Sequence, residues 1–288
     1  MFTRAIVRPP AGNFFEGLTT SGLDAPDYER ALAQHQAYCA ALEQCGLTLT
    51  RLEADPDYPD ATFVEDTAVV ATLLTPRVHR GSSIIRESCA VLTRPGAPSR
   101  AGEVASIRRM LADLFPTVSE IQSPGTLDGG DVCEAGSHFF IGISERTNGA
   151  GAEQLAELLA PYGYTSSFVN IRCADAMKSK PRSVGAATGS GLDILHLKSG
   201  LAYLGDKRLV VTDALANRAE FSGYDLIRVN SDEEYAANCV RVNDQVLVAA
   251  GYPRFEGELR EFGYRTIALE MTEFQKMDGG LSCLSLRI

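Results

Sequence analysis

The stretch GGLSCLSLRI, residues 279–288, joins a glycine-containing turn to an alternating apolar run, which predicts a strand at the end of the chain. Four earlier segments have the same form, a polar or glycine-containing turn that leads into a strand; they are 63–70, 127–136, 195–205 and 236–251. We call these five features the lead-in turns. Their uneven repetition predicts one supersecondary unit used about five times around a central axis. The turns then converge on one place, and the last segment must be a central strand that closes the ring.

Predicted helices alternate with predicted strands along the chain. Apolar residues recur at intervals of three and four, which indicates amphipathic helices, in 26–45, 102–114, 150–161 and 255–262. Short strands are predicted at 3–8, 48–53, 138–143, 208–212, 245–250 and 264–270. This is an α/β pattern without a linker, so we expect one domain over residues 1–288. Two stretches rich in Arg, Lys, Ser, Gly and Pro interrupt it as loops or insertions, 73–89 and 173–193.

Composition limits the classes of function. The 288 residues carry a net charge of −10, and an acidic chain is a poor generic binder of nucleic acid. No apolar run approaches the roughly 18 residues of a membrane helix. Pro9 and Pro10 stand where a signal peptide needs its apolar centre, so we expect a cytoplasmic protein that does not bind membranes. The seven cysteines are odd in number and lack a CxxC spacing, which argues against structural zinc or a disulfide framework and predicts mostly buried thiols.

Two residue types narrow the search for chemistry. Of the four histidines, only His196 lies in a lead-in turn, although a single histidine is more often a structural group. Cys283 alone is more often part of a core, yet the two glycines before it would let a substrate approach the thiol. A cysteine nucleophile needs its thiolate, so Cys283 would require a positive partner or a cationic substrate.

Charged residues near the lead-in turns have two interpretations. Five carboxylates stand there: Asp60, Glu65, Asp66, Asp128 and Asp131. Such groups often form turns, but paired carboxylates also bind the donor fork of a guanidinium. Arg94 and Arg146 at strand ends are either solvated or, if they converge, able to bind a carboxylate. Together with a Cys–His pair, these groups fit an arginine-like amino acid as the ligand. Composition and pattern alone indicate no more than an acidic α/β protein with such a pair.

Longer motifs carry a family resemblance. They are FVED at 63–66, TRPGAPSR at 93–100, GTLDGGD at 125–131, ERTN at 145–148, LHLKSGLAYL at 195–204, YAANC at 235–239 and DGGLSCLSLR at 278–287. In this order they resemble the dimethylarginine dimethylaminohydrolases, which belong to the guanidino-group modifying superfamily with arginine deiminases and amidinotransferases. The resemblance runs from about residue 2 to residue 288, apart from the two insertions.

The resemblance implies a five-bladed α/β-propeller with pseudo-fivefold symmetry and an enzyme that uses no metal or other cofactor. It implies hydrolysis of a small molecule, Nω-methylated L-arginine, to L-citrulline and a methylamine, and, as often in this family, a homodimer. By position it makes Cys283 the nucleophile, His196 the general acid and base, and Asp128 the carboxylate that orients the histidine. It assigns substrate contacts to Leu18, Asp60, Glu65, Asp66, Arg94, Arg146 and Met277.

Within that set, the resemblance gives each group a part of the substrate. Glu65 and Asp66 would hold the guanidinium, and Arg94 and Arg146 would hold the α-carboxylate. The backbone carbonyls of Leu18 and Met277 would meet the α-amine.

Two other functions stay open. A deiminase or another guanidino-acid hydrolase of the superfamily is the first, but arginine deiminases tend to carry an aspartate two positions after the histidine, where this chain has Lys198. A propeller used only for binding is the second, and such propellers lack the pair that Cys283 and His196 would form. We also expect one of the two insertions to act as a lid that alters which side chain is admitted.

Overall fold

The computed structural model describes residues 1–74, 77–78, 84–85, 88–172 and 194–288. The insertion 173–193, and any lid that it forms, lies outside the described residues. The insertion 73–89 is described in part, and in it β4 (Arg77–Val78) pairs antiparallel with β5 (Ile84–Ile85). No helix among the described residues is long and apolar enough to cross a membrane.

Five three-stranded sheets form the frame of the molecule: β17–β1–β2, β3–β6–β7, β8–β9–β10, β11–β12–β13 and β14–β15–β16. The strands are β1 Arg4–Val7, β2 Thr48–Arg51, β3 Ala68–Thr72, β6 Ser88–Leu92, β7 Thr117–Glu120, β8 Val132–Ala135, β9 His138–Ile143, β10 Thr165–Asn170, β11 Leu201–Gly205, β12 Arg208–Thr212, β13 Asp225–Val229, β14 Val240–Val242, β15 Gln245–Ala249, β16 Arg265–Leu269 and β17 Leu286–Arg287. In every sheet the first strand runs antiparallel to the middle strand, which runs parallel to the third. The repeated unit predicted from the lead-in turns is therefore confirmed.

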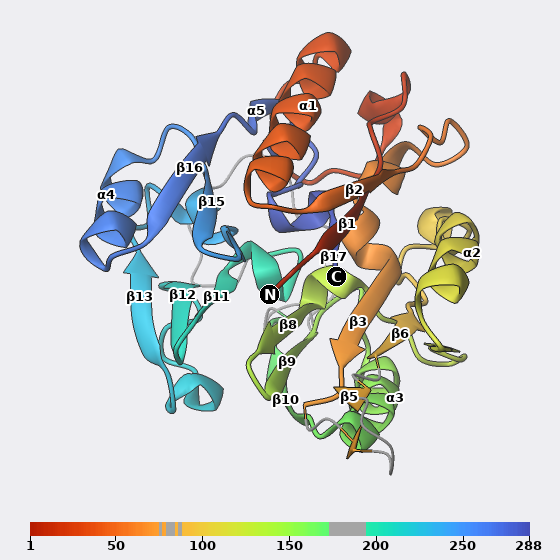
Figure 1. The fold of residues 1–288 in the computed structure, drawn as a ribbon. Coiled ribbons are helices and arrows are strands. Elements are labelled where there is room, and N and C mark those ends of the chain that lie inside the picture. Colours follow the sequence, from red (N-terminus) through yellow and green to blue (C-terminus); the bar gives the residue numbers. More distant parts are fainter. Residues whose placement is uncertain (75–76, 79–83, 86–87, 173–193) are drawn as a thin grey trace, which may run out of the picture.

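The first strands of the five sheets surround a common axis. β17 contacts β3, β8 contacts β11, and β11 contacts β14, and Figure 1 shows the sheets arranged around the middle of the molecule. The ring closes where β17 pairs with β1, with Ala5 opposite Arg287 and Ile6 opposite Leu286. The fold is a five-bladed α/β-propeller in which the two ends of the chain together complete one blade.

The terminal segment differs from its prediction in two respects. β17 lies at the common axis and closes the ring, as predicted, but it comprises only Leu286 and Arg287. Cys283 does not lie on a strand, because a 3-10 helix over Ser282–Leu284 precedes β17. Residues 279–286 are all buried, so their apolar character reflects a fully enclosed turn and not one face of a strand.

Four longer helices lie on the outside of the ring (Figure 1), as the apolar periods predicted: α1 Tyr28–Gln44, α2 Val104–Leu114, α3 Gly149–Leu159 and α4 Pro253–Glu261. Each joins the middle strand of a sheet to its third strand, whereas the sheet β11–β12–β13 has only the 3-10 helix Ala219–Phe221 there. Their starts follow local chemistry, since Asp27 caps α1 and Asn148 caps α3 by accepting backbone N–H groups. The short α5 (Thr272–Gln275) was not predicted, because one turn of helix carries no apolar period.

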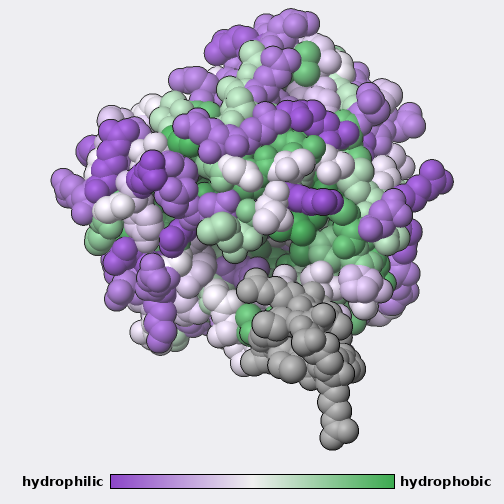
Figure 2. Space-filling model, viewed as in Figure 1, coloured by the Kyte–Doolittle hydropathy of each residue, from purple (hydrophilic) through white to green (hydrophobic). Residues whose placement is uncertain are grey.

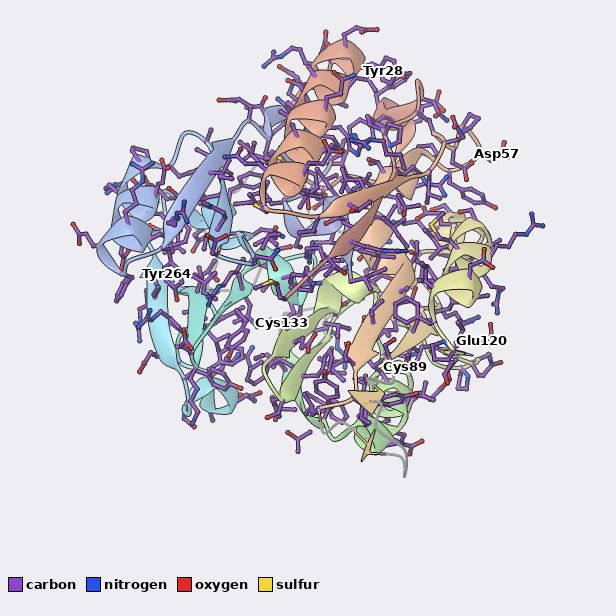
Figure 3. The ribbon with its side chains drawn as sticks, viewed as in Figure 1. Tyr28, Asp57, Cys89, Glu120, Cys133 and Tyr264 are labelled. Carbon is purple, nitrogen blue, oxygen red and sulfur yellow. The ribbon has the colours of Figure 1, made fainter. Side chains whose placement is uncertain are left out.

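The hydrophobic core is divided among the blades. In one cluster, Leu155 and Leu159 of α3 pack against Phe139 and Ile141 of β9. Figure 2 shows polar residues over much of the rim of the viewed face and apolar residues nearer its middle. The six described cysteines are buried, free thiols, as predicted for most cysteines of this chain. Figure 3 places two of them, Cys89 and Cys133, among the strands.

A 3-10 helix stands at each lead-in turn, at most two residues before the first strand of a sheet: Val64–Thr67, Gly129–Asp131, Leu197–Ser199, Glu234–Ala237 and Ser282–Leu284. The first of these contacts the second and the fifth, and the third contacts the second and the fourth. The lead-in turns therefore converge, as the sequence predicted, and they bring together residues from along the whole chain.

Candidate active site

A narrow cavity opens where the lead-in turns meet. Its described lining is Leu18, Asp60, Phe63, Asp66, Arg100, Arg146, Leu195, His196, Met277, Asp278, Gly279 and Cys283. Seven of these residues were candidates from the sequence: Leu18, Asp60, Asp66, Arg146, His196, Met277 and Cys283. The fold thus brings together residues up to 265 positions apart, from Leu18 to Cys283.

His196 is held by a buried carboxylate. Its Nε2 lies 3.0 Å from Oδ2 of Asp128, whose other oxygen accepts the backbone N–H of Gly96 at 2.8 Å. Asp128 is fully buried and His196 is 7% exposed, so water does not compete for this contact. The arrangement fixes the ring and leaves Nδ1 as the nitrogen able to exchange a proton with a ligand.

Opposing effects set the charge of His196. Burial lowers the pKa of the ring, but the charge of Asp66, the hydrogen bond to Asp128 and the charge of Asp131 raise it to about 9. His196 is therefore an imidazolium at neutral pH. Such a ring is equipped to donate a proton to a departing amine.

Asp66 is the carboxylate most strongly coupled to that ring. Its Oδ2 accepts a hydrogen bond from Arg100 at 2.6 Å, and its Oδ1 accepts the N–H of Gly130 at 2.8 Å. Burial opposes ionisation of Asp66, yet His196 and Arg100 lower its pKa to about 2. Asp66 is therefore a fixed negative charge on the cavity wall.

Arg100 was not among the sequence candidates. It is 5% exposed and forms paired hydrogen bonds with Glu103, at 2.9 and 2.8 Å, besides its bond to Asp66. The sequence contains one signal for it, its place at the end of the motif TRPGAPSR, but no periodicity distinguishes a buried arginine from a solvated one. Its part is to neutralise and hold Asp66.

Asp131, the second acid of LDGGD, holds the backbone of the turn that carries His196. Its Oδ2 accepts hydrogen bonds from the hydroxyls of Ser144 and Thr147, both at 2.6 Å, and its Oδ1 accepts the backbone N–H of Leu197 at 2.9 Å. Burial raises the pKa of Asp131 to about 6 against these bonds and the charge of His196. Asp131 thereby anchors the residue that follows the histidine.

Cys283 faces the same cavity from the fifth lead-in turn. The backbone N–H of Gly280 points at its Sγ at 3.4 Å. Burial, with the nearby charges of Glu65 and Asp66, raises the pKa of the thiol to about 12. Without a ligand Cys283 is thus a neutral thiol, and a cation bound beside it would favour the thiolate.

The residues assigned to the substrate's α-amine lie on loops that are tied together by hydrogen bonds. Both carboxylate oxygens of Asp60 lie 3.1 Å from the backbone N–H of Leu18. The loop after Leu18 is tied down by the hydroxyls of Thr19 and Ser21, which donate to the carbonyl of Lys276 at 2.8 and 2.7 Å. Leu18 and Met277 therefore stand on two loops that are bonded to each other at the cavity.

Three sequence candidates are not among the described lining residues: Asp128, which holds His196, and also Glu65 and Arg94. Glu65 turns toward the ring centre, where its carboxylate binds Lys198 at 2.6 Å, Ser282 at 2.7 Å and Arg287 at 3.1 Å. Arg94 is exposed, and it donates to the carbonyl of Gly125 at 3.1 Å. Glu65 already has cationic partners within the protein, which could not be read from its place in FVED.

Three buried groups have metal-ligating atoms within 4.8 Å of one another: Asp66, Asp128 and His196. Their oxygens already accept hydrogen bonds from Arg100 and from the N–H groups of Gly96 and Gly130. The hydrogen-bonding pattern fits a proton-transfer group with fixed carboxylates.

Comparisons with known proteins agree with the resemblance found in the sequence motifs. No protein-family model matches the chain. It is 39% identical over 288 residues to the N(G),N(G)-dimethylarginine dimethylaminohydrolase of Pseudomonas aeruginosa, covering all of both chains. It is 31% identical over 291 residues to the protein of that name from Streptomyces coelicolor, covering 99% of this chain and 96% of that protein.

The chain is also similar to solved structures of the same fold, and two of them contain a ligand. A mutant of the Pseudomonas aeruginosa enzyme in complex with citrulline superimposes with a TM-score of 0.85 at 38% identity, over all of both chains. An adduct of a dimethylarginine dimethylaminohydrolase with S-methyl-L-thiocitrulline gives a TM-score of 0.84, also over all of both chains. The N-terminal domain of the cyanobacterial arginine dihydrolase ArgZ, at 19% identity and a TM-score of 0.75, shares the fold.

Proposed function

The chain belongs to the dimethylarginine dimethylaminohydrolase family, and from that premise we propose that it hydrolyses Nω-methylated L-arginine to L-citrulline and a methylamine. One structural observation supports the proposal in addition to family membership. His196, held by the buried Asp128, and the thiol of Cys283 face one narrow cavity that is also lined by a fixed carboxylate, Asp66. A thiol, an imidazolium and an anion fit the hydrolysis of a guanidinium.

The two ends of the substrate are proposed to bind different walls. Asp66 attracts the guanidinium, while Glu65 acts on it through its charge. Arg146 binds the α-carboxylate, with Arg94 as a second, more exposed partner. Asp60 and the carbonyls of Leu18 and Met277 receive the α-amine. Such positioning of a substrate by several groups supplies a large share of rate enhancement, because it removes translational and rotational freedom before the reaction.

The first half of the reaction forms a covalent intermediate. Binding of the cationic guanidinium lowers the pKa of Cys283, and the thiol proton leaves to solvent. The thiolate attacks the central guanidinium carbon and forms a tetrahedral adduct. The imidazolium of His196 donates its proton to the methylamine nitrogen, the C–N bond breaks, and a thiouronium on Cys283 remains.

The second half releases citrulline. His196 is now neutral, and it takes a proton from a water that attacks the thiouronium carbon. The second tetrahedral adduct then collapses: the C–S bond breaks, the carbonyl of citrulline forms, and the hydroxyl proton passes to the departing sulfur, which restores the neutral thiol of Cys283. Asp128 keeps the ring oriented through both steps. Acid and base work by one positioned group typically contributes about 10²–10⁴-fold in rate.

The deiminase alternative is less well supported by the site. Where arginine deiminases tend to have an aspartate, Lys198 directs its ammonium to Glu65 at 2.6 Å, so this position offers no free carboxylate to an unsubstituted guanidinium. The methylated substrate is therefore favoured over plain arginine.

The test follows citrulline formed from asymmetric dimethylarginine, monomethylarginine and plain arginine. We expect the methylated substrates to be hydrolysed faster than arginine, and Cys283→Ser to abolish turnover. Faster turnover of arginine would overturn the substrate assignment, and turnover that survives in Cys283→Ser would overturn the mechanism. Absence of turnover with every guanidino acid would favour a binding function.

We also propose, from the family, a cytoplasmic homodimer. Light scattering of the purified chain is expected to give twice the 31.0 kDa of one chain. A mass equal to one chain at micromolar concentration would contradict the dimer.

A further inference from the structure

The fourth lead-in turn has no part in the chemistry proposed above. The other turns each bring a side chain to the cavity or to its histidine: Asp66, Asp128, His196 and Cys283. The fourth turn, Glu234–Ala237, ends at Asn238, which is not among the described residues that line this cavity. Its contribution must therefore be sought in what Asn238 contacts.

The side chain of Asn238 bonds to two neighbouring turns at once. Its Oδ1 accepts the backbone N–H of Ser282 at 2.9 Å. Its Nδ2 donates to the carbonyl of Lys198 at 3.0 Å and to the hydroxyl of Ser282 at 3.2 Å. Asn238 is only 7% exposed, and both N–H bonds of its amide are used.

These contacts lie next to both proposed catalytic residues. Ser282 directly precedes Cys283, and Lys198 follows His196 by two positions. The amide also packs against Gly280, where a Cβ would come within 2.4 Å of Cγ of Asn238. The N–H of Gly280 is the group that points at Sγ of Cys283. Asn238 therefore touches the backbone just before the thiol, at Gly280 and Ser282, and the carbonyl of Lys198 in the histidine turn.

We propose that Asn238 is a positioning residue that fixes the Cys283 turn against the His196 turn. The two turns belong to different blades, so their relative placement depends on contacts between blades. A buried amide that bonds to both holds them in one register. A displacement of about 1 Å between reacting groups can cost about 10²-fold in rate, so this link bears directly on catalysis.

The chain offers a matched control in Asn243. Its Oδ1 accepts the N–H of Phe2 at 2.8 Å, and its Nδ2 donates to the carbonyls of Phe2 at 3.1 Å and Cys45 at 2.9 Å. Asn238 and Asn243 thus use their amides in the same way, with one bond accepted and two donated. Exchange of either for aspartate keeps the accepted bond and removes both donations, but only the exchange at 238 acts next to Cys283.

The experiment compares Asn238→Asp with Asn243→Asp by steady-state hydrolysis of monomethylarginine. We expect Asn238→Asp to lower kcat by about 10- to 100-fold with little change in KM, because substrate contacts stay in place. Asn243→Asp is expected to lower the melting temperature and leave kcat near that of the wild type. Equal losses of kcat in both variants, or none in Asn238→Asp, would overturn the proposal.

A second readout does not depend on the substrate. Alkylation of Cys283 by iodoacetamide, followed by peptide mass spectrometry across pH, reports its thiolate. In Asn238→Asp we expect slower labelling with its rise moved to higher pH, because a carboxylate stands beside the thiol. Asn238→Ser weakens the link without adding charge. It should lower kcat and change the rate of labelling at a given pH without that move, and it serves if the aspartate variant does not fold.

The kinetic test of Asn238 rests on the proposed function, whereas the alkylation test does not. The two tests therefore show which of the two proposals fails. If the wild type hydrolyses no methylarginine, the proposed function fails, while alkylation of Cys283 still tests Asn238. Because the added charge alone slows labelling in Asn238→Asp, the neutral variant decides: a rate of Cys283 labelling that is identical in the wild type and Asn238→Ser would overturn the positioning role.

Discussion

Replacing Asp66 by asparagine should change the charge of His196 with little change in shape. Asp66 is the largest influence that raises the pKa of this ring, which reaches about 9 against an ordinary 6.5. An asparagine keeps an oxygen to accept the N–H of Gly130 but carries no charge. Arg100 keeps its paired bonds to Glu103, so the cavity wall retains a support.

The free energy involved follows from the raised pKa of His196. One pKa unit corresponds to about 1.4 kcal/mol, so the folded protein favours the imidazolium of His196 by roughly 3 kcal/mol. This stability is fully present below pH 6.5, the ordinary value, and is lost as pH rises through about 9. Without the charge of Asp66, burial counts for more, and the pKa of His196 falls. A fall of even one unit makes the imidazolium about tenfold scarcer at a pH above both values.

Nuclear magnetic resonance of ¹⁵N-labelled histidine rings measures the effect directly. The pKa of His35 is lowered by burial to about 4, and that of His138 is also lowered by burial, so among the described histidines His196 alone has a raised pKa. A His196→Gln spectrum assigns the signal. We expect one ring that titrates near 9 in the wild type and at clearly lower pH in Asp66→Asn.

The same variant tests the chemistry. The alkaline limb of the pH profile of kcat/KM should move to lower pH with the pKa of His196, since the proton donor is lost earlier. The reasoning would be refuted if the wild-type ring of His196 titrated near or below 6.5, or if Asp66→Asn left its pKa unchanged.

Three further substitutions have expected outcomes. Gly130→Ala should reduce kcat by about 10²-fold or more, since a Cβ would stand 2.7 Å from Nδ1 of His196, whereas Gly149→Ala, with open space around it, should not; equal activities would contradict the close approach. Arg146→Gln should raise KM for methylarginine by about 10- to 100-fold in steady-state assays, as expected for loss of a charged hydrogen bond, and an unchanged KM would remove Arg146 from the carboxylate site. Lys198→Met should lower the free energy of unfolding in urea by about 3 kcal/mol, because it leaves a buried carboxylate with one cation fewer, and a loss below about 0.5 kcal/mol would show that the pair contributes little.

Much of the fold could be predicted because it depends on local patterns. The periods of three and four located α1, α2, α3 and α4, and the lead-in turns located the repeated unit. The exact form of the last turn could not be predicted. A 3-10 helix around Cys283 and an alternating strand both require apolar residues when every side is buried, so the sequence 279–286 does not distinguish them.

The site was predictable in part for a different reason. His196 was found because no other histidine lies in a lead-in turn, whereas Asp128 and Cys283 were assigned because long motifs resemble a family. The direction of a buried charge was not predictable, as the two acids of FVED show. Asp66 faces the cavity, while Glu65 faces the ring centre, and partners far along the chain decide between the two directions.

The central claim is that Cys283 carries the substrate's amidine carbon during turnover. Rapid acid quenching of the wild type with monomethylarginine, followed by mass spectrometry of the intact chain and of its peptides, tests this most directly. The mechanism predicts a thiouronium adduct on Cys283 that forms and decays as citrulline appears, and that is absent in Cys283→Ser. Citrulline formation without any adduct, or with an adduct on another residue, would contradict it.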